Sequence, residues 1–175
     1  MRVSDYVLSR LADEGVKRIF LVYGGAIGEL VDGFTRTNRI DYVATMGEQC
    51  AGFAAEGYAK ASHGLGVAMA TSGPGGGNLV TAIQNCFYDS VPVLFITGQV
   101  NTKFMRPDPS IRQLGFQETD IVSIVEPITK YAATVKEAST IRFHLSMALH
   151  TCKTDRPGPC LIDIPINVQK EEISC

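Results

Sequence analysis

The sequence predicts an α/β fold, a three-layer sandwich in which helices flank a central, mainly parallel sheet of about six strands. Two observations predict it. Short apolar runs alternate with helical patterns along the whole chain, and glycine-rich or polar turns follow the ends of these runs. The length of 175 residues fits one domain, and 45% hydrophobic with 19% charged residues is typical of a folded protein.

Each predicted element follows from its apolar spacing. Residues 3–14 carry apolar side chains on one helical face, and Gly15 then stands where a helix usually ends. Residues 19–23 form a continuous apolar run before two glycines, which is typical of a strand buried on both faces. Further helices are expected at 27–34, 48–62, 78–88, 119–125 and 138–151, and further strands at 42–45, 66–71, 93–97, 131–135 and 160–164. Residues 101–114 are expected to be irregular.

The chain shows no internal repeat, low-complexity segment or linker before its last residues. We therefore expect one domain over residues 1–168. After Ile166 the sequence turns polar, and residues 169–175 are predicted to be a polar tail or the start of a linker to other domains.

Composition and charge exclude several classes of function. The net charge is −2 and no basic cluster stands out, so binding to nucleic acid has no electrostatic support. No apolar run is long enough to span a bilayer, and the first residues lack the apolar core of a signal peptide. The five cysteines are odd in number and widely spaced, which suits a reducing compartment, and we expect a cytoplasmic protein.

Glycine and polar residues gather where the predicted strands end, and in parallel sheets this is the edge at which ligands bind. Known motifs do not fit there. Asn78 occupies the last glycine position of a dinucleotide fingerprint, no P-loop is present, and Ala70 replaces the glycine that a nucleophile elbow needs. The three histidines lack metal-ligand spacing, so no metal site is predicted. The glycine turn at 73–77 is either a ligand cradle or a tight turn that contacts nothing.

Several segments together resemble a known family. In their order and spacing they are similar to the N-terminal, pyrimidine-binding domain of thiamine-diphosphate enzymes of the acetolactate synthase and pyruvate oxidase type. Any one segment is a weak signal, but seven in order across nearly the whole chain are a strong one. The segments are 23–26, 47–59, 71–78, 89–100, 116–120, 127–130 and 156–165.

The resemblance implies thiamine diphosphate as cofactor and Glu48 as its activator. In this family a glutamate hydrogen-bonds N1′ of the aminopyrimidine and shifts the ring toward the tautomer that takes the proton from C2 of the thiazolium. Without the resemblance, a glutamate in a first helical turn would be interpreted as a partner of the helix dipole. The cofactor-binding residues that the resemblance implies are Tyr23, Gly24, Gly25, Glu48, Ser72, Gly73, Asn78 and Gln117. Phe116 either reaches into the same site or packs in the core.

The family also needs parts that the chain's motifs do not supply. Its Mg²⁺ and the cofactor's diphosphate are held by a second domain marked by Gly-Asp-Gly, a motif that does not occur here. We expect that domain in the same longer chain or in a partner subunit, and a homo-oligomer, dimer or tetramer. The small residues of helix 51–61 either face another subunit or pack on the sheet.

The expected function is part of an enzyme that acts on a 2-oxo acid by decarboxylation with carboligation or acyl transfer. The alternatives are a simple 2-oxo acid decarboxylase, a carbon–carbon lyase subunit, or a non-catalytic coenzyme-binding α/β domain. Two residues depart from the family: Gly47 stands where relatives usually have histidine, and Tyr23 where they usually have proline. Residues 101–113 are also unlike the synthase, and this loop helps to shape the substrate pocket.

Overall fold

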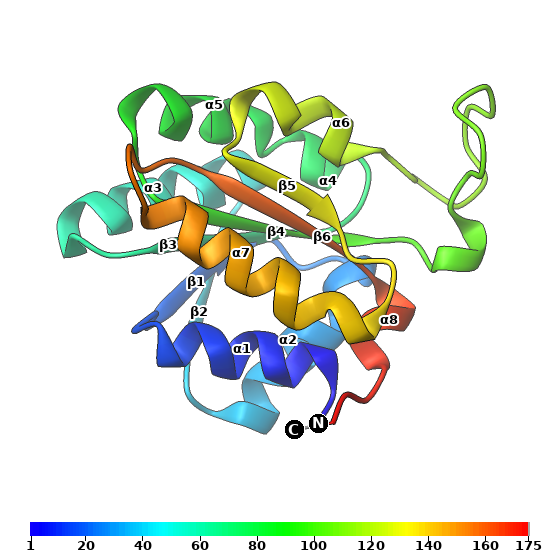
Figure 1. The fold of residues 1–175 in the computed structure, drawn as a ribbon, viewed down its shortest axis with the longest axis horizontal. Helices are drawn as coiled ribbons and strands as arrows, with labels where there is room; N and C mark the ends of the chain where they lie inside the picture. The colour runs from blue at the N-terminus through cyan, green and yellow to red at the C-terminus, as the bar shows by residue number, and fades with distance from the viewer. Residues whose placement is uncertain (175) are drawn as a thin grey trace.

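A computed structural model describes residues 1–174 and shows six parallel strands in one sheet (Figure 1). Their order across the sheet is β2-β1-β3-β4-β6-β5. The strands are β1 (Arg18–Leu21), β2 (Asp41–Ala44), β3 (Gly66–Ala70), β4 (Val93–Gln99), β5 (Tyr131–Thr134) and β6 (Cys160–Pro165). All neighbouring strands pair in parallel. The predicted fold class, a three-layer α/β sandwich around about six strands, is confirmed.

Helices cover both faces of the sheet. One face is covered by α1 (Val3–Asp13), α2 (Gly28–Thr37), α7 (Ile141–Lys153) and α8 (Ile166–Lys170). The other is covered by α3 (Glu48–Ser62), α5 (Val80–Asp89) and α6 (Ile121–Val125), with the short α4 (Pro74–Gly77) preceding α5. Short 3₁₀ turns lie at Gly25–Ile27, Thr102–Phe104, Glu126–Ile128 and Ala138–Thr140.

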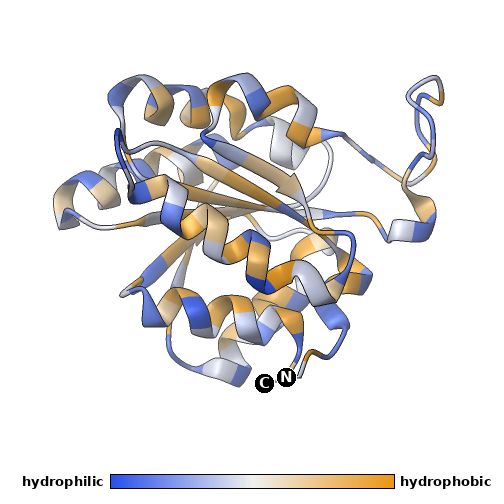
Figure 2. Cartoon of the chain, viewed as in Figure 1, coloured by the Kyte–Doolittle hydropathy of each residue, from blue (hydrophilic) through white to orange (hydrophobic). Residues whose placement is uncertain are grey.

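The side chains of the apolar strands contribute to two separate cores, because successive side chains point to opposite faces of the sheet. In β4, Leu94 and Ile96 face α1 and α7, whereas Val93 and Phe95 face α3 and α5. Figure 2 shows hydrophobic residues concentrated along the central strands. In a strand that faces a core on both sides every side chain is buried, which explains the unbroken apolar runs in the sequence.

The predicted elements agree with the structure to within a few residues, apart from one split and one helix, α8, that was not predicted. The helix expected at 78–88 begins earlier, as α4, and is interrupted before α5. The irregular segment predicted after residue 100 contains one 3₁₀ turn, and in Figure 1 the chain between β4 and α6 stands away from the body of the domain. None of the helices within residues 1–174 is long and apolar enough to cross a membrane.

Residues 169–173, which follow the last strand, pack against the domain. α8 ends at Lys170, and Gln169 is fully buried although it was expected in a polar tail. After α8, Glu172 forms a β-bridge with Arg2, and the amide of Ile173 donates to the carbonyl of Met1 at 2.9 Å. Residues 172–173 therefore lie beside the first two residues of the chain (Figure 1). The domain boundary at residue 168 stays a prediction, and Cys175 lies outside the described residues.

The small residues of α3 pack inside this chain. Ala51, Gly52, Ala55 and Ala59 are buried, and a Cβ added at Gly52 would lie 2.4 Å from Cβ of Ala82 on α5. For these four residues the expectation that they face another subunit is wrong, because their small side chains admit α5 and the sheet. Gly57 on the same helix is exposed, with nothing within 4 Å of an added Cβ, so the expectation stays a prediction there. The opposite face of the helix keeps Phe53 exposed.

Candidate functional site

The strand order places a crevice beside the ends of β1 and β3. The chain passes from β1 to β2 on one side and then returns to β3 on the other, so the connections after β1 and β3 diverge between these two strands. Ligands in open parallel sheets bind at such a switch point, outside the carboxyl ends of the strands. The predicted glycine segments at 24–25 and 72–77 follow these two strands, which brings them to one place.

Glu48 is the first residue of α3 and lies at the same edge. Its side chain is half-buried, and its Oε2 accepts a 3.0 Å hydrogen bond from Nδ2 of Asn78. Oε1 accepts no hydrogen bond from the described part of the chain. Asn78 follows α4 directly, so the glycine turn after β3 sets the position of the amide that orients Glu48. The two residues predicted at 48 and 78 are thus brought into contact.

Thr71 connects Glu48 to the loop after β1. A Cβ added at Gly75 would lie 2.7 Å from Cγ2 of Thr71 and 3.4 Å from Oε1 of Glu48. On its other side, Thr71 packs so closely on Gly24 that a Cβ there would lie 2.3 Å from its own Cβ. Its Oγ1 accepts a hydrogen bond from the amide of Ala26 at 3.2 Å. Glycine is required at 24 and 75 because Thr71 fills the space between the two turns.

Next to these turns is an open cavity of about 800 Å³. Four predicted site residues line it, namely Gly24, Gly25, Ser72 and Gln117. Its remaining lining is largely apolar and comes from the chain after β4 and from α8: Ala26, Thr71, Gln99, Val100, Asn101, Phe104, Leu114, Gly115, Phe116 and Ile166. A mostly apolar cavity with a few polar groups is the usual form of a small-molecule site.

Gly73 and Gln117 bring the loop after β4 against the turn after β3. Gly73 has φ +64, and a Cβ there would lie 2.5 Å from the carbonyl oxygen of Gln117. Gln117 itself is left-handed, with φ +54. Only glycine allows this backbone approach. The contact between Gly73 and Gln117 therefore joins the long loop after β4 to the glycine turn after β3.

The loop 24–26 is anchored from α8 by a residue that the sequence did not single out. The Nε2 of Gln169 donates to the carbonyls of Ala26 and Ile164, both at 2.7 Å, while its Oε1 has no partner within the described residues. Thr71 was missed in the same way as a loop-holding residue. A polar side chain at a helical position that faces a core is the signal that could have identified Gln169.

Two predicted residues lie at the margin. Tyr23 is 66% exposed and does not line the cavity, and its hydroxyl is the atom closest to a Cβ added at Gly28, at 3.8 Å. Its cofactor contact stays a prediction. Phe116 lines the cavity but is 80% exposed, so the alternative that it packs in the core is wrong.

A buried carboxylate lies behind the cavity wall. Asp163 on β6 is 1% exposed and accepts hydrogen bonds from Oγ1 of Thr97 at 2.7 Å and from Nε2 of Gln99 at 3.0 Å. Burial raises the pKa of Asp163 to about 6, although these hydrogen bonds act in the opposite direction. The sequence signal was present, because Asp163 interrupts an otherwise apolar strand.

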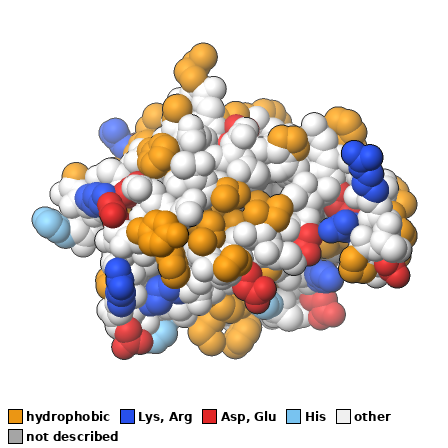
Figure 3. All heavy atoms as spheres, turned by 90° about the horizontal axis from the view of Figure 1, so that it is seen from above, with side chains coloured by type: hydrophobic (Ala, Val, Ile, Leu, Met, Phe, Trp, Pro, Cys, Tyr) orange, Lys and Arg blue, Asp and Glu red, His pale blue; other side chains and the backbone are white. Residues whose placement is uncertain are grey.

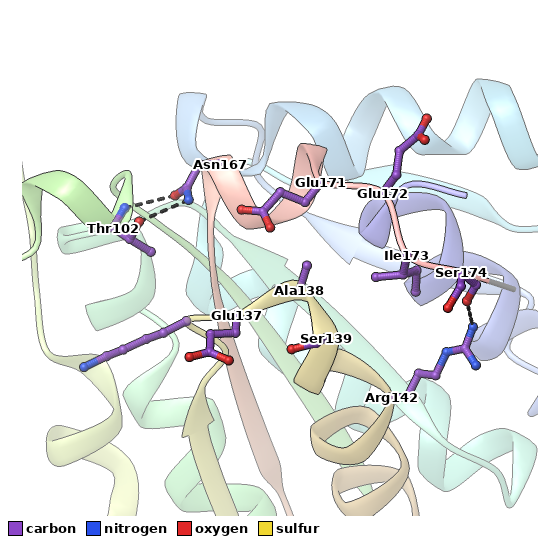
Figure 4. A pocket seen from close by; sticks show the side chains of 11 residues that line it. Thr102, Glu137, Ala138, Ser139, Arg142, Asn167, Glu171, Glu172, Ile173 and Ser174 are labelled. Carbon is purple, nitrogen blue, oxygen red and sulfur yellow. Dashed lines mark hydrogen bonds between the residues drawn. The ribbon is translucent and has the colours of Figure 1, made fainter.

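A second cavity, of about 720 Å³, lies beside the start of α7 (Figure 4). Most of its lining side chains are polar or charged, and Figure 4 shows Arg142 reaching toward Ser174 while Asn167 meets Thr102. None of the predicted site residues lines it, so it is separate from the candidate site. Within residues 1–174 no group of three or more His, Cys, Asp or Glu side chains is arranged to hold a metal ion.

Comparison with known proteins agrees with this geometry. Residues 1–124 match the family described as thiamine pyrophosphate enzyme, N-terminal TPP binding domain. The chain is 41% identical over 171 residues to the acetolactate synthase large subunit of Lactococcus lactis subsp. lactis (strain IL1403), covering 98% of this chain and 29% of that protein. It is 40% identical over 168 residues to the chloroplastic acetolactate synthase 2 of Brassica napus, covering 96% and 25%.

A relative with a different name matches almost as well. The glyoxylate carboligase of Escherichia coli O157:H7 is 36% identical over 174 residues, covering 99% of this chain and 28% of that protein. The chain therefore spans less than a third of the length of these curated relatives.

Proposed function

We propose that this chain, which belongs to the thiamine pyrophosphate enzymes as an N-terminal TPP-binding domain, forms the pyrimidine-binding half of an active site. We further propose that Glu48 activates the cofactor there. The resemblance found in the sequence is confirmed by the family match over residues 1–124. The observation that carries the role of Glu48 is its contact with Asn78 at the switch-point crevice.

The residues at the crevice fit the pyrimidine ring of thiamine diphosphate. Gly24 and Gly25 present backbone without side chains, and Oε1 of Glu48 is free to hydrogen-bond a ring nitrogen such as N1′. Ser72 and Gln117 line the adjoining cavity, and Gly73 packs on the backbone of Gln117. Gly73 and Tyr23 are proposed to contact the cofactor from the margin of the site. When bound, thiamine diphosphate supplies a nucleophilic carbon and an electron sink for reactions of 2-oxo acids.

Glu48 would act by orientation and proton exchange. Asn78 holds one of its carboxylate oxygens, so the other has a fixed direction. A glutamate held this way is already in the conformation in which it exchanges a proton with a ring nitrogen. A preorganised general acid or base speeds the reaction because no side-chain rearrangement precedes proton transfer.

The experiment for Glu48 is C2 proton exchange of bound thiamine diphosphate in the full-length enzyme. Glu48→Gln should slow the exchange by about a hundredfold or more, the usual range for a lost proton-transfer group. Glu126→Gln, at an exposed position away from the cavity, is the matched control and should exchange like the natural enzyme. Equal exchange in the two variants would refute the role.

The proposed substrate is a 2-oxo acid, and the proposed reaction is decarboxylation with carboligation or acyl transfer. The names of the relatives, acetolactate synthase and glyoxylate carboligase, support a ligation. A simple decarboxylase or carbon–carbon lyase shares the cofactor chemistry. A screen of 2-oxo acids with the full-length enzyme, scoring both CO₂ and ligated product, separates these reactions because only a ligase joins two carbonyl compounds.

Mg²⁺ and the diphosphate are proposed to be held by a second domain, in a longer chain or a partner subunit. The greater length of the relatives supports this. A homo-oligomer is proposed because exposed apolar side chains gather on the face covered by α3, α5 and α6 (Figure 3), among them Phe53, Phe87, Tyr88 and Ile124. A cytoplasmic location is proposed from the free thiols of Cys50, Cys86, Cys152 and Cys160.

A further inference from the structure

Asp163 is a buried charge without a cation. It lies on β6 directly between Thr97 of β4 and Thr134 of β5 in the strand register, and it is 1% exposed. Its hydrogen-bond donors are neutral: Thr97 at 2.7 Å, Gln99 at 3.0 Å and Thr134 at 3.4 Å. A charge buried without a counter-ion costs free energy that an apolar residue would not. Stability alone therefore does not account for an aspartate here.

The carboxylate fixes the orientation of Gln99. A carboxylate only accepts hydrogen bonds, so Gln99 must turn its NH₂ group toward Asp163. The second N–H of that group then donates to the carbonyl of Thr119 at 2.8 Å, while Oε1 accepts from the amide of Val100 at 2.9 Å. The reversed amide would set its oxygen against both the carboxylate and a carbonyl. Gln99 is 2% exposed and all of its N–H groups are satisfied.

Thr119 lies at the end of the long loop that carries the cavity residues. Two residues before it, Gln117 packs its backbone on Gly73. Glu118 stabilises the loop from inside, since its carboxylate accepts from the amides of Arg106 at 2.6 Å and Leu114 at 3.2 Å.

The opposite end of this loop is held by a different group. The side chain of Asn167 on α8 exchanges hydrogen bonds with Thr102 at 2.9 and 3.1 Å (Figure 4). The anchor at Thr102 does not involve Asp163, whereas the hydrogen bonds of Gln99 to Thr119 and Val100 depend on it.

We propose that Asp163 is a positioning residue: acting through Gln99, it holds the Phe116–Gln117 end of the loop against the Gly73 turn, where substrate meets the cofactor. The inference rests on the proposed function, because it assigns the cavity beside these residues to the 2-oxo acid. Asp163 is buried behind the cavity wall and does not line the cavity. It acts by fixing one amide, which fixes the loop.

The experiment compares Asp163→Asn with the natural full-length enzyme. Asparagine keeps the shape but lets Gln99 reverse, which frees the carbonyl of Thr119. The KM for the 2-oxo acid should rise about tenfold, the equivalent of one lost hydrogen bond to a charged group, with little change in kcat. In hydrogen exchange, amides of residues 114–119 should exchange faster by a similar factor, whereas those of β4 and β6 should not change.

Two further variants separate positioning from structural support. Gln99→Met removes the link and keeps the volume, so it should reproduce Asp163→Asn, which also covers the case in which the latter does not fold. Thr134→Val removes the longest hydrogen bond to Asp163 and leaves Gln99 in place, so the KM should stay unchanged. The inference is overturned if KM and loop exchange are unaffected in both Asp163→Asn and Gln99→Met, or if the strands loosen as much as the loop.

The outcome is distinguishable from failure of the proposed function. C2 proton exchange depends on Glu48 and should be normal in Asp163→Asn. If Glu48→Gln has no effect on this exchange, the proposed function fails, whereas the exchange of amides 114–119 still reports on Asp163.

Discussion

Nδ2 of Asn78 donates a 3.0 Å hydrogen bond to Oε2 of Glu48, joining the end of the glycine turn after β3 to the start of α3. The contact leaves Oε1 of Glu48 free above Gly75, where an added Cβ would lie 3.4 Å away. A similar pair lies about two helical turns further along, where Asn85 donates to Glu56 at 2.8 and 2.9 Å. Glu56 is buried and also meets Lys60, so the second pair is structural where the first faces the crevice.

Asn78→Ala should slow C2 proton exchange of bound thiamine diphosphate by about tenfold without unfolding the protein. The loss corresponds to one hydrogen bond to a charged group, and Asn78 is exposed, so its removal leaves no buried polar atom unsatisfied. The measurement is C2 exchange in the full-length enzyme, together with the denaturant midpoint.

Asn85→Ala is the matched control for this prediction. It should leave C2 exchange unchanged and lower the free energy of unfolding by roughly 1–3 kcal/mol, because it removes both Asn85 hydrogen bonds from the buried Glu56. If both variants slowed the exchange equally, the distinction between the two pairs would not hold.

The adjacent glycines Gly24 and Gly25 should respond differently to alanine. At Gly24 the new methyl would lie 2.3 Å from Cβ of Thr71, whereas at Gly25 nothing lies within 4 Å. Gly24→Ala should lower the free energy of unfolding by roughly 1–3 kcal/mol through overpacking. Gly25→Ala should change it by about 0.5 kcal/mol or less. Urea unfolding of both variants tests this, and equal losses would contradict the packing seen at Thr71.

The free energy of unfolding should depend on pH because of Asp163. Its pKa is about 6 in the folded chain, raised by burial from 3.8, so the folded state binds more protons between these values. The stability that this group contributes is full below about pH 4 and is lost as pH rises through about 6. The free energy of unfolding of the natural chain should therefore fall, relative to Asp163→Asn, by roughly 2 kcal/mol between pH 4 and 7.

Asp108 supplies a control of opposite sign. The backbone amide of Ser110 hydrogen-bonds its carboxylate and lowers its pKa, so its contribution is present above the ordinary pKa and is lost as the pH falls. Asp108→Asn should therefore change the slope of the free energy of unfolding against pH in the other direction, and only at acid pH. A slope that Asp163→Asn leaves unaltered would show that the buried carboxylate does not titrate in this range.

The sequence was sufficient to predict the fold and the edge of the sheet that carries the site. Unbroken apolar runs revealed the doubly covered strands, and the glycines at 24–25 and 73–77 marked the turns that approach one another. These are local signals, each visible within a few residues.

The contacts that hold the site together could not be predicted in this way. Asp163 meets Thr97 and Gln99 only because β6 pairs with β4, an arrangement that depends on strand order rather than on any nearby residue. Gln169 stands in a segment that turns polar, so its burial under the loop 24–26 follows from how α8 packs on α1 and α2. The sequence identified side chains that face the crevice and missed those that support it from behind.

Gln169→Met should weaken cofactor binding more than it weakens the fold. Methionine has a similar size and shape but cannot donate, so the carbonyl of Ala26 loses a 2.7 Å hydrogen bond. The loop 24–26 then keeps its hydrogen bond to Thr71 and its packing on Gly98. The substitution also removes Oε1, a buried acceptor without a protein partner, and this offsets part of the lost stability. The Kd of thiamine diphosphate in the full-length enzyme, measured by calorimetry at saturating Mg²⁺, should rise about tenfold. Gln84→Met on the exposed side of α5 should leave it unchanged, and an equal Kd in the two variants would show that the loop keeps its position without Gln169.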